Sequence, residues 1–117
     1  MKAFLIDVEA QKVVEIQLNT WKDIAPTIGN DCTIFTTPVT FDNNDTLYSD
    51  DEGLLKEFYG GIMMEDWAYR IVGNCILQGT DEDGDPTDPI MTKEELEAMI
   101  IWMTKDECME YHGEQYF

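Results

Sequence analysis

Basic residues are scarce in this 117-residue sequence. Seven lysines and arginines stand against twenty-five aspartates and glutamates, and there is a single histidine. The resulting formal charge of −18 opposes folding through self-repulsion, which indicates that a partner or an environment makes the charge useful. Direct binding to nucleic acid or to an anionic membrane is disfavoured by such a charge. A basic surface is its natural target.

Cysteines are few, and no apolar run is long. Cys32, Cys75 and Cys108 are odd in number, which is untypical of a secreted disulfide framework and fits a reducing cytosol. No stretch approaches the roughly 20 apolar residues that span a bilayer. The first seven residues end on a charge, and no apolar run there suits a signal peptide. We therefore expect a cytoplasmic protein without a membrane partner.

The apolar content is nevertheless sufficient for a folded core. Hydrophobic residues make up 44% of the chain and aromatic residues 11%, more than an acidic disordered tail would carry. The length suits one domain and leaves no room for two well-formed cores. We expect residues 1–117 to form a single acidic domain, in which 105–117 adds a short helix or an ordered tail.

Several segments have the patterns of β-strands. Residues 2–8 are mostly apolar, residues 12–18 alternate between apolar and polar side chains, and a short polar connector joins them, so they predict an opening β-hairpin. Residues 31–41 and 71–79 also predict strands, with a short strand at 46–49 between them.

Two segments have the signals of helices. Thr20 with Asp23 makes an acidic capping box for a short helix, and Thr92 with Glu95 makes a second capping box. We expect the second helix to run from about 93 to 104, because apolar residues there have the spacing of a core-facing helix. That apolar stripe comprises Leu96, Met99, Ile100 and Met103.

The fold class that follows is α+β. We expect a small antiparallel sheet that opens with a β-hairpin, with two or three short helices packed on it.

Five segments occur in the order of a known family. They lie at 1–7, 28–31, 50–55, 72–74 and 80–88, and the most specific pair is DDEGLL at 50–55 followed by VGN at 72–74. Over roughly residues 1–100 the chain resembles a family of small acidic proteins, of unassigned function, encoded by bacteriophages and other mobile elements. The chain departs from this pattern in a longer insert at 57–69 and in an aromatic, acidic tail after 104. The resemblance implies a phage or mobile-element protein that acts in the cytoplasm of a bacterial host cell, and it supplies no catalytic residue.

Three acidic clusters stand out, and the first two contain no basic residue. If the clusters share one face, their field would steer a basic groove onto the protein; otherwise they are solvated turns and helix ends. We predict partner-binding residues in the first two. The first cluster is Asp42, Asp45, Asp50, Asp51 and Glu52, the second is Asp81, Glu82, Asp83, Asp85 and Asp88, and the third is Glu94, Glu95, Glu97, Asp106, Glu107, Glu110 and Glu114, diluted by Lys93 and Lys105.

The second cluster begins like an EF-hand calcium loop but does not continue like one. Asp81, Asp83 and Asp85 have the right spacing, yet the sixth position is Pro86 where glycine is needed and the twelfth is Thr92 where a bidentate glutamate belongs. We predict no metal site here.

Catalytic patterns are weak. Cys108 and His112 are four residues apart, so on a helix they would lie side by side as a nucleophile–base pair or half a zinc site. Cys32 and Cys75 lie in apolar strand patterns, where a cysteine is usually buried, and a chain end is a poor place to preorganise chemistry. We predict no catalytic residue and no cofactor.

Aromatic residues gather in two places. Phe58, Tyr59, Trp67 and Tyr69 lie close together in the sequence, and most of them are expected in the core. Trp102 falls off the apolar stripe of its predicted helix, so we expect it to be an exposed anchor for a partner.

The sequence thus predicts a non-enzymatic phage or mobile-element protein. It would bind a basic, nucleic-acid-binding surface of a host or defence protein, such as a CRISPR nuclease or a restriction enzyme, and inhibit it as a DNA or RNA mimic. The first alternative is a small structural or regulatory interaction module, or a homodimer, whose acidity serves solubility. The second is a metal-dependent enzyme that uses the 81–88 loop or Cys108 with His112.

Overall fold

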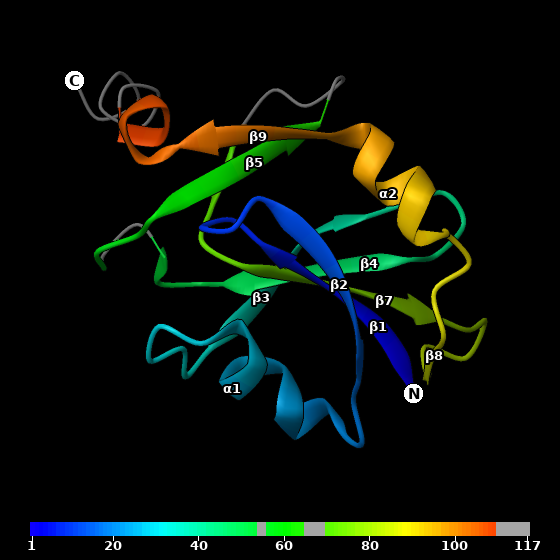
Figure 1. The fold of residues 1–117 in the computed structure, drawn as a ribbon. Coiled ribbons are helices and arrows are strands. Elements are labelled where there is room, and N and C mark those ends of the chain that lie inside the picture. Colours follow the sequence, from blue (N-terminus) through cyan, green and yellow to red (C-terminus); the bar gives the residue numbers. More distant parts are fainter. Residues whose placement is uncertain (54–55, 65–69, 110–117) are drawn as a thin grey trace.

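Two antiparallel sheets form the framework of the described chain, which comprises residues 1–53, 56–64 and 70–109 of the computed structural model. The larger sheet contains β1 (Lys2–Asp7), β2 (Lys12–Gln17), β3 (Phe35–Thr40), β4 (Thr46–Asp50), β7 (Cys75–Thr80) and β8 (Pro86–Thr87). The smaller sheet contains β5 (Gly60–Met64), β6 (Ile71–Val72) and β9 (Ile100–Thr104), and the helical elements are η1 (Trp21–Asp23), α1 (Ile24–Ile28) and α2 (Lys93–Met99). This architecture confirms the α+β class (Figure 1).

The order of the larger sheet is β2–β1–β7–β4–β3, with β8 paired to the end of β7. β1 and β2 form the expected opening hairpin. Because successive side chains of a strand point to opposite faces, β1 contributes to two cores: Phe4 and Ile6 lie in one, and Ala3 lies in the other.

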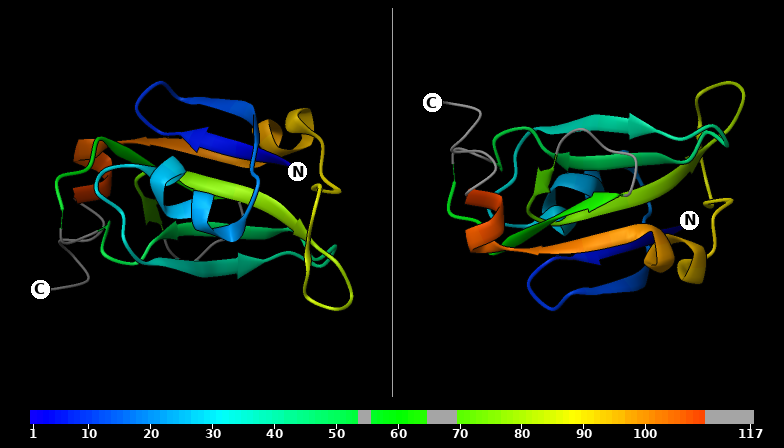
Figure 2. Two further views of the ribbon diagram at one scale, coloured as in Figure 1. Left: turned by 90° about the horizontal axis from the view of Figure 1, so that it is seen from below. Right: turned by 90° about the horizontal axis from the view of Figure 1, so that it is seen from above.

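The larger sheet is the middle of three layers, which are stacked in Figure 1 and overlap in the two views of Figure 2. One of its faces packs against the smaller sheet and α2, and this interface holds the main core, which includes Leu47, Ile62, Leu77 and Leu96. The opposite face is covered by α1, where Ile24 and Ile28 are buried. Burial of both faces explains why consecutive residues are apolar in the middle of β1, at 3–6, and at the start of β7, at 75–77.

The first helical segment has the predicted start. The Thr20 side chain accepts a hydrogen bond from the Lys22 backbone N–H, and Asp23 accepts from the backbone N–H groups of Asn19 and Thr20. A 3₁₀ turn then continues into the short helix α1, which ends at Gly29 with φ +80°.

β3 begins later than the pattern of residues 31–41 predicts and lies at the edge of the sheet. Its register with β4 shifts between Thr36 and Val39. Pro38 lies within this irregularity. Because proline has no backbone N–H, it cannot donate a hydrogen bond to β4 at this position.

The predicted strand at 71–79 is two strands. The chain bends at Gly73 and Asn74, with φ +79° at Gly73, so that β6 belongs to the smaller sheet and β7 to the larger. The residues of both strands are buried, which explains why the segment at 71–79 is apolar. The spacing of its apolar residues does not reveal the bend between the two strands.

The prediction of a helix over 93–104 is wrong after residue 99. α2 ends at Met99, and the next five residues form β9, which pairs antiparallel with β5. The β-branched Ile100 and Ile101 suit a strand, and ψ is +132° at Ile100. Leu96, Ile100 and Met103 are buried as expected, whereas Met99 is exposed.

The 57–69 insert supplies β5, the central strand of the smaller sheet, within its described part. On the outer face of this sheet a small core joins Phe58, Val72, Met103 and Cys108. Residues 105–109 begin a helix, as predicted for the start of 105–117, and Thr104 caps it reciprocally with Glu107. Trp67, Tyr69 and residues 110–117 lie outside the described residues. No helix in the described ranges has the length and apolar character needed to cross a membrane.

Candidate functional site

The sheet register brings two acidic turns to the same end of the molecule. β4 and β7 are antiparallel, with Thr46 opposite Gln78, so the turn that precedes β4 lies beside the turn that follows β7. The hydroxyl oxygens of Thr46 and Thr80 are 3.2 Å apart. α2 begins next to the same turns (Figure 1).

The same register divides the first predicted cluster. Asp42 and Asp45 precede β4, whereas Asp50, Asp51 and Glu52 come at its other end, where Ser49 pairs with Cys75. At about 3.3 Å per residue, the length of β4 separates the two groups by roughly 15 Å. The predicted cluster at 42–52 is therefore two separate groups.

Asp45 has a structural position. Its side chain is fully buried, and its carboxylate accepts hydrogen bonds from the backbone N–H of Ile90, at 2.9 Å, and of Met91, at 2.8 Å. These bonds fasten the β3–β4 turn to the segment that leads into α2. Its carboxylate is therefore occupied inside the protein and inaccessible to a partner.

Two further predicted residues also have internal partners. The Asp81 carboxylate accepts the backbone N–H of Asp83, at 2.9 Å, and of Asp85, at 2.8 Å, which closes the β7–β8 turn. The Asp88 carboxylate accepts the Lys2 backbone N–H at 2.8 Å.

Apart from Asp81, the exposed carboxylates of the two turns and of the start of α2 form a surface that we call the acidic end. Asp88 and Glu95 belong to it because they are exposed, although each also accepts one backbone N–H. Lys93, at the start of α2, is paired with Glu97 at 3.5 Å. The acidic end is defined by the exposed residues Asp42, Glu82, Asp83, Asp85, Asp88, Glu94 and Glu95.

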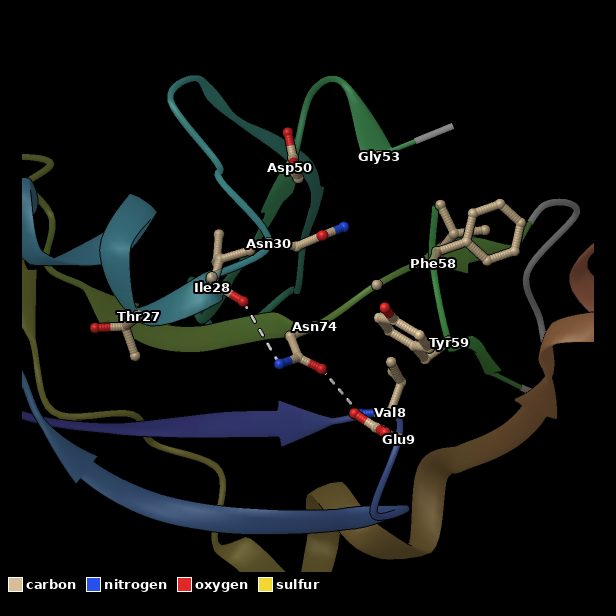
Figure 3. Close-up of a pocket in the computed structure, with 13 residues that line it drawn as sticks. Val8, Glu9, Thr27, Ile28, Asn30, Asp50, Gly53, Phe58, Tyr59 and Asn74 are labelled. Atoms are coloured by element: carbon tan, nitrogen blue, oxygen red, sulfur yellow. Dashed lines mark hydrogen bonds between the residues drawn. The ribbon is translucent and has the colours of Figure 1, made fainter. Parts of the chain in front are cut away.

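A pocket of about 300 Å³ lies at the opposite end of β4. Its wall is formed by the start of the β1–β2 turn, the end of α1, the end of β4, the residues before β5 and the bend between β6 and β7. Figure 3 shows the side chains of Asn30, Phe58, Tyr59 and Asn74 gathered around this space.

Asn74 joins three walls of the pocket. Its side-chain oxygen accepts the Val8 backbone N–H at 3.0 Å, and its amide nitrogen donates to the Ile28 carbonyl at 3.5 Å. The bend in the 71–79 segment therefore fixes both the β1–β2 turn and the end of α1.

Lys56 holds a left-handed turn at the rim of the pocket. Asn30 and Asp31 have φ values of +52° and +57°, in the left-handed region that glycine favours and that Asn and Asp enter more readily than other residues. The Lys56 ammonium donates to both of their carbonyl oxygens, at 3.1 and 3.0 Å, and to the Asp50 carboxylate at 2.8 Å. The hydrogen bond to Asp50 raises the pKa of Lys56.

The thiols are not set up for nucleophilic chemistry. Burial raises the pKa of Cys75 to about 12 and that of Cys108 to about 11, so both stay protonated at neutral pH. Burial, followed by the Asp50 charge, also raises the pKa of Cys32. His112, the predicted neighbour of Cys108, lies outside the described residues.

Among residues 1–53, 56–64 and 70–109, no group of three or more histidine, cysteine or acidic residues is arranged to hold a metal ion.

Trp102 lies in β9 with its side chain partly buried against the main core. Among the residues that the structure describes, the large apolar side chains with the greatest exposure are elsewhere: Ile90, Trp21 and Ile34, at 68%, 62% and 56%. Tyr59 is 54% exposed.

The pocket was not predicted from the sequence, although a signal for it was present. The segments Ile28–Asn30, Asp50–Gly53 and Val72–Asn74, which carry part of the family resemblance, all contribute residues to its lining. Each contains a glycine, and Gly29 and Gly73 have positive φ values of +80° and +79°. Segments that are far apart in the sequence and marked by glycine at tight bends are the pattern that could have indicated a common site.

Comparisons with known proteins give no match: neither protein-family models, nor curated proteins, nor solved structures resemble this chain significantly.

Proposed function

We propose that this protein acts by binding, not by catalysis, and that it docks its acidic end onto a basic, nucleic-acid-binding surface of a host or defence protein and inhibits it. The observation that carries the proposal is the juxtaposition of two acidic turns, neither of which contains a basic residue, at one end of the larger sheet.

Charge density supports mimicry of a nucleic acid. The molecule is 41 Å along its longest axis, and duplex DNA carries about 24 phosphate charges over such a length, at one per ~1.7 Å. The net charge of −18 is of the same order. A surface with this field accelerates encounter with a basic groove and repels acidic proteins.

The bacterial setting of the proposal rests on the resemblance to phage and mobile-element proteins. A protein from such an element gains from blocking a nuclease that would cut its DNA. The acidic end would then occupy the channel in which the nuclease holds its nucleic acid.

The test is affinity capture from a bacterial lysate with the tagged protein, at about 50 mM and about 500 mM NaCl. A triple variant, Glu82→Gln, Asp83→Asn and Asp85→Asn, removes three charges from the acidic end. A matched control, Glu15→Gln, Asp51→Asn and Asp106→Asn, removes three exposed charges elsewhere. We expect the wild-type protein to capture a nucleic-acid-binding protein at low salt and to lose it at high salt. The first triple variant should fail to capture this protein, whereas the control variant should retain it.

A duplex DNA oligonucleotide serves as the competitor in the same experiment. Because the proposal requires the two to share one surface, the oligonucleotide should displace the captured protein. The proposal would be contradicted if duplex DNA left the captured protein in place. It would also be contradicted if both triple variants captured the protein equally well. A complex that is insensitive to salt would indicate an apolar interface instead.

A further inference from the structure

We propose that the pocket beside α1 binds a small, flat organic cation of the amidinium or guanidinium class. This inference does not depend on the proposed function, because the pocket and the acidic end lie at opposite ends of β4.

The charges around the pocket favour a cation. Its described lining contains two carboxylates, those of Glu9 and Asp50, and no lysine, arginine or histidine. The Asp50 side chain is 5% exposed and is paired with Lys56 at 2.8 Å, so the exposed carboxylate of Glu9 is the one that is available to a cation. Lys56 is close by, but its ammonium is directed to Asp50 and to two backbone carbonyls of the 30–31 turn. An anionic ligand would therefore meet no available cation in the lining, in a molecule whose net charge of −18 already repels it.

The aromatic and apolar walls favour a flat ligand. Phe58 is buried, whereas Tyr59 is 54% exposed and therefore open to contact. Val8, Ile28 and Val72 add apolar surface. A cation that lies over an aromatic face is attracted by the ring quadrupole, and a volume of about 300 Å³ is at the lower end of the range for small-molecule sites.

Two glycines leave the backbone of the pocket uncovered. A Cβ built at Gly29 or at Gly73 would have no heavy atom within 4 Å, so a flat ligand has room to approach the peptide groups there. The left-handed turn that follows Gly29 is held in place by the hydrogen bonds of Lys56 to the carbonyl oxygens of Asn30 and Asp31. These features describe a pocket whose shape exists before the ligand arrives.

The experiment compares three ligands of nearly one shape: benzamidine, which is cationic, benzamide, which is neutral, and benzoate, which is anionic. Binding is measured by titration calorimetry and by backbone amide NMR shifts, at about 150 mM NaCl so that diffuse attraction is screened. We expect benzamidine to bind at least about fivefold more tightly than benzamide, the size of a modest cation–π contribution, and benzoate not to bind. The shifts should centre on Gly29, Gly73 and Asn74.

Variants with exposed side chains test the assignment without threatening the fold. Tyr59→Ala and Glu9→Gln should each weaken benzamidine binding by about fivefold. The matched controls Trp21→Ala and Glu15→Gln remove an exposed aromatic ring and an exposed carboxylate elsewhere and should leave affinity unchanged.

Two results would overturn the inference. One is equal binding of the three ligands, and the other is a set of shifts centred on the acidic end, which would indicate non-specific attraction.

Discussion

At the scale of single residues, the carboxylates of this protein divide into two kinds. Some, such as Asp42, are exposed and do not stabilise the fold. Others accept hydrogen bonds from backbone N–H groups that would otherwise be buried without partners. Asp45 is the clearest example of the second kind, since both of its oxygens accept a hydrogen bond from the segment before α2. The large negative charge is therefore partly structural.

The variant Asp45→Ala should lower the free energy of unfolding by about 2–4 kcal/mol, because it leaves the N–H groups of Ile90 and Met91 without acceptors. Asp42→Ala removes the same charge from the same turn and should change stability by less than about 0.5 kcal/mol. Urea unfolding of both variants measures the difference. Equal effects would show that the buried carboxylate contributes nothing beyond its charge.

Cys75 gives the protein a dependence on alkaline pH. Burial raises the pKa of its thiol to about 12, whereas the thiol of an unfolded chain ionises near pH 8.5. Above that pH the unfolded state releases a proton that the folded state retains. The buried thiol therefore makes its full contribution to the free energy of unfolding below about pH 8.5. This contribution falls by about 1.4 kcal/mol per pH unit as the pH rises toward 12.

In Cys75→Ala the loss of stability between about pH 8 and pH 10 should be smaller than in the wild type by about 1–2 kcal/mol. Cys32→Ala serves as the control and should have a smaller effect, because Cys32 is only partly buried. Urea unfolding at both pH values provides the comparison. Parallel pH dependence in the wild type and in Cys75→Ala would contradict the assignment.

At the scale of elements, the smaller sheet depends on close contacts around β5. Gly61 lies in this central strand, and a Cβ there would collide with the Ile71 carbonyl oxygen in β6 and come within 2.7 Å of the Cys108 sulfur. The absence of a side chain therefore lets β6 and the helix that begins at 105 approach β5.

Gly61→Ala should destabilise the protein by about 2–3 kcal/mol, as overpacking does when backbone cannot move aside. It should also reduce hydrogen-exchange protection in β5 and β6 more than in β1 and β7. Gly84→Ala provides a comparison, because that glycine has a positive φ in an exposed turn with no neighbour near its Cβ position. Its cost should be about 1 kcal/mol, from backbone strain alone. A smaller loss for Gly61→Ala than for Gly84→Ala would contradict the packing argument.

At the scale of the whole molecule, the dominant quantity is the net charge. Exposed carboxylates occur at the acidic end, near the pocket and at the start of the C-terminal helix, so mutual repulsion acts across the entire surface. Dissolved salt screens this repulsion over a distance that is shorter than the molecule.

The melting temperature should therefore rise as NaCl increases from about 20 mM to about 500 mM, because screening removes repulsion that is greatest in the compact state. The triple variant Glu82→Gln, Asp83→Asn and Asp85→Asn should melt higher at low salt and gain less from added salt. Calorimetry or circular dichroism measures both. A melting temperature that is independent of salt would show that self-repulsion is negligible.

Local signals in the sequence predicted a substantial part of the fold. The opening hairpin, the capping box at Thr20, the capping box at Thr92 and the α+β class are all present. These features depend on residues that are close together in the chain, through alternation of apolar side chains and through side-chain caps. They are for that reason readable without knowledge of the tertiary structure.

Other features were decided only by tertiary contacts. The 100–104 segment matches a helical spacing, yet it forms β9 because β5 offers a strand to pair with. The first acidic cluster is contiguous in sequence but divided by β4, and its two parts acquire different neighbours through pairing with β7. The pocket is assembled from segments up to 66 residues apart, such as Val8 and Asn74. The sequence by itself determined the charge and the local elements, whereas the position of each carboxylate, and whether it is exposed or buried, depended on long-range pairing.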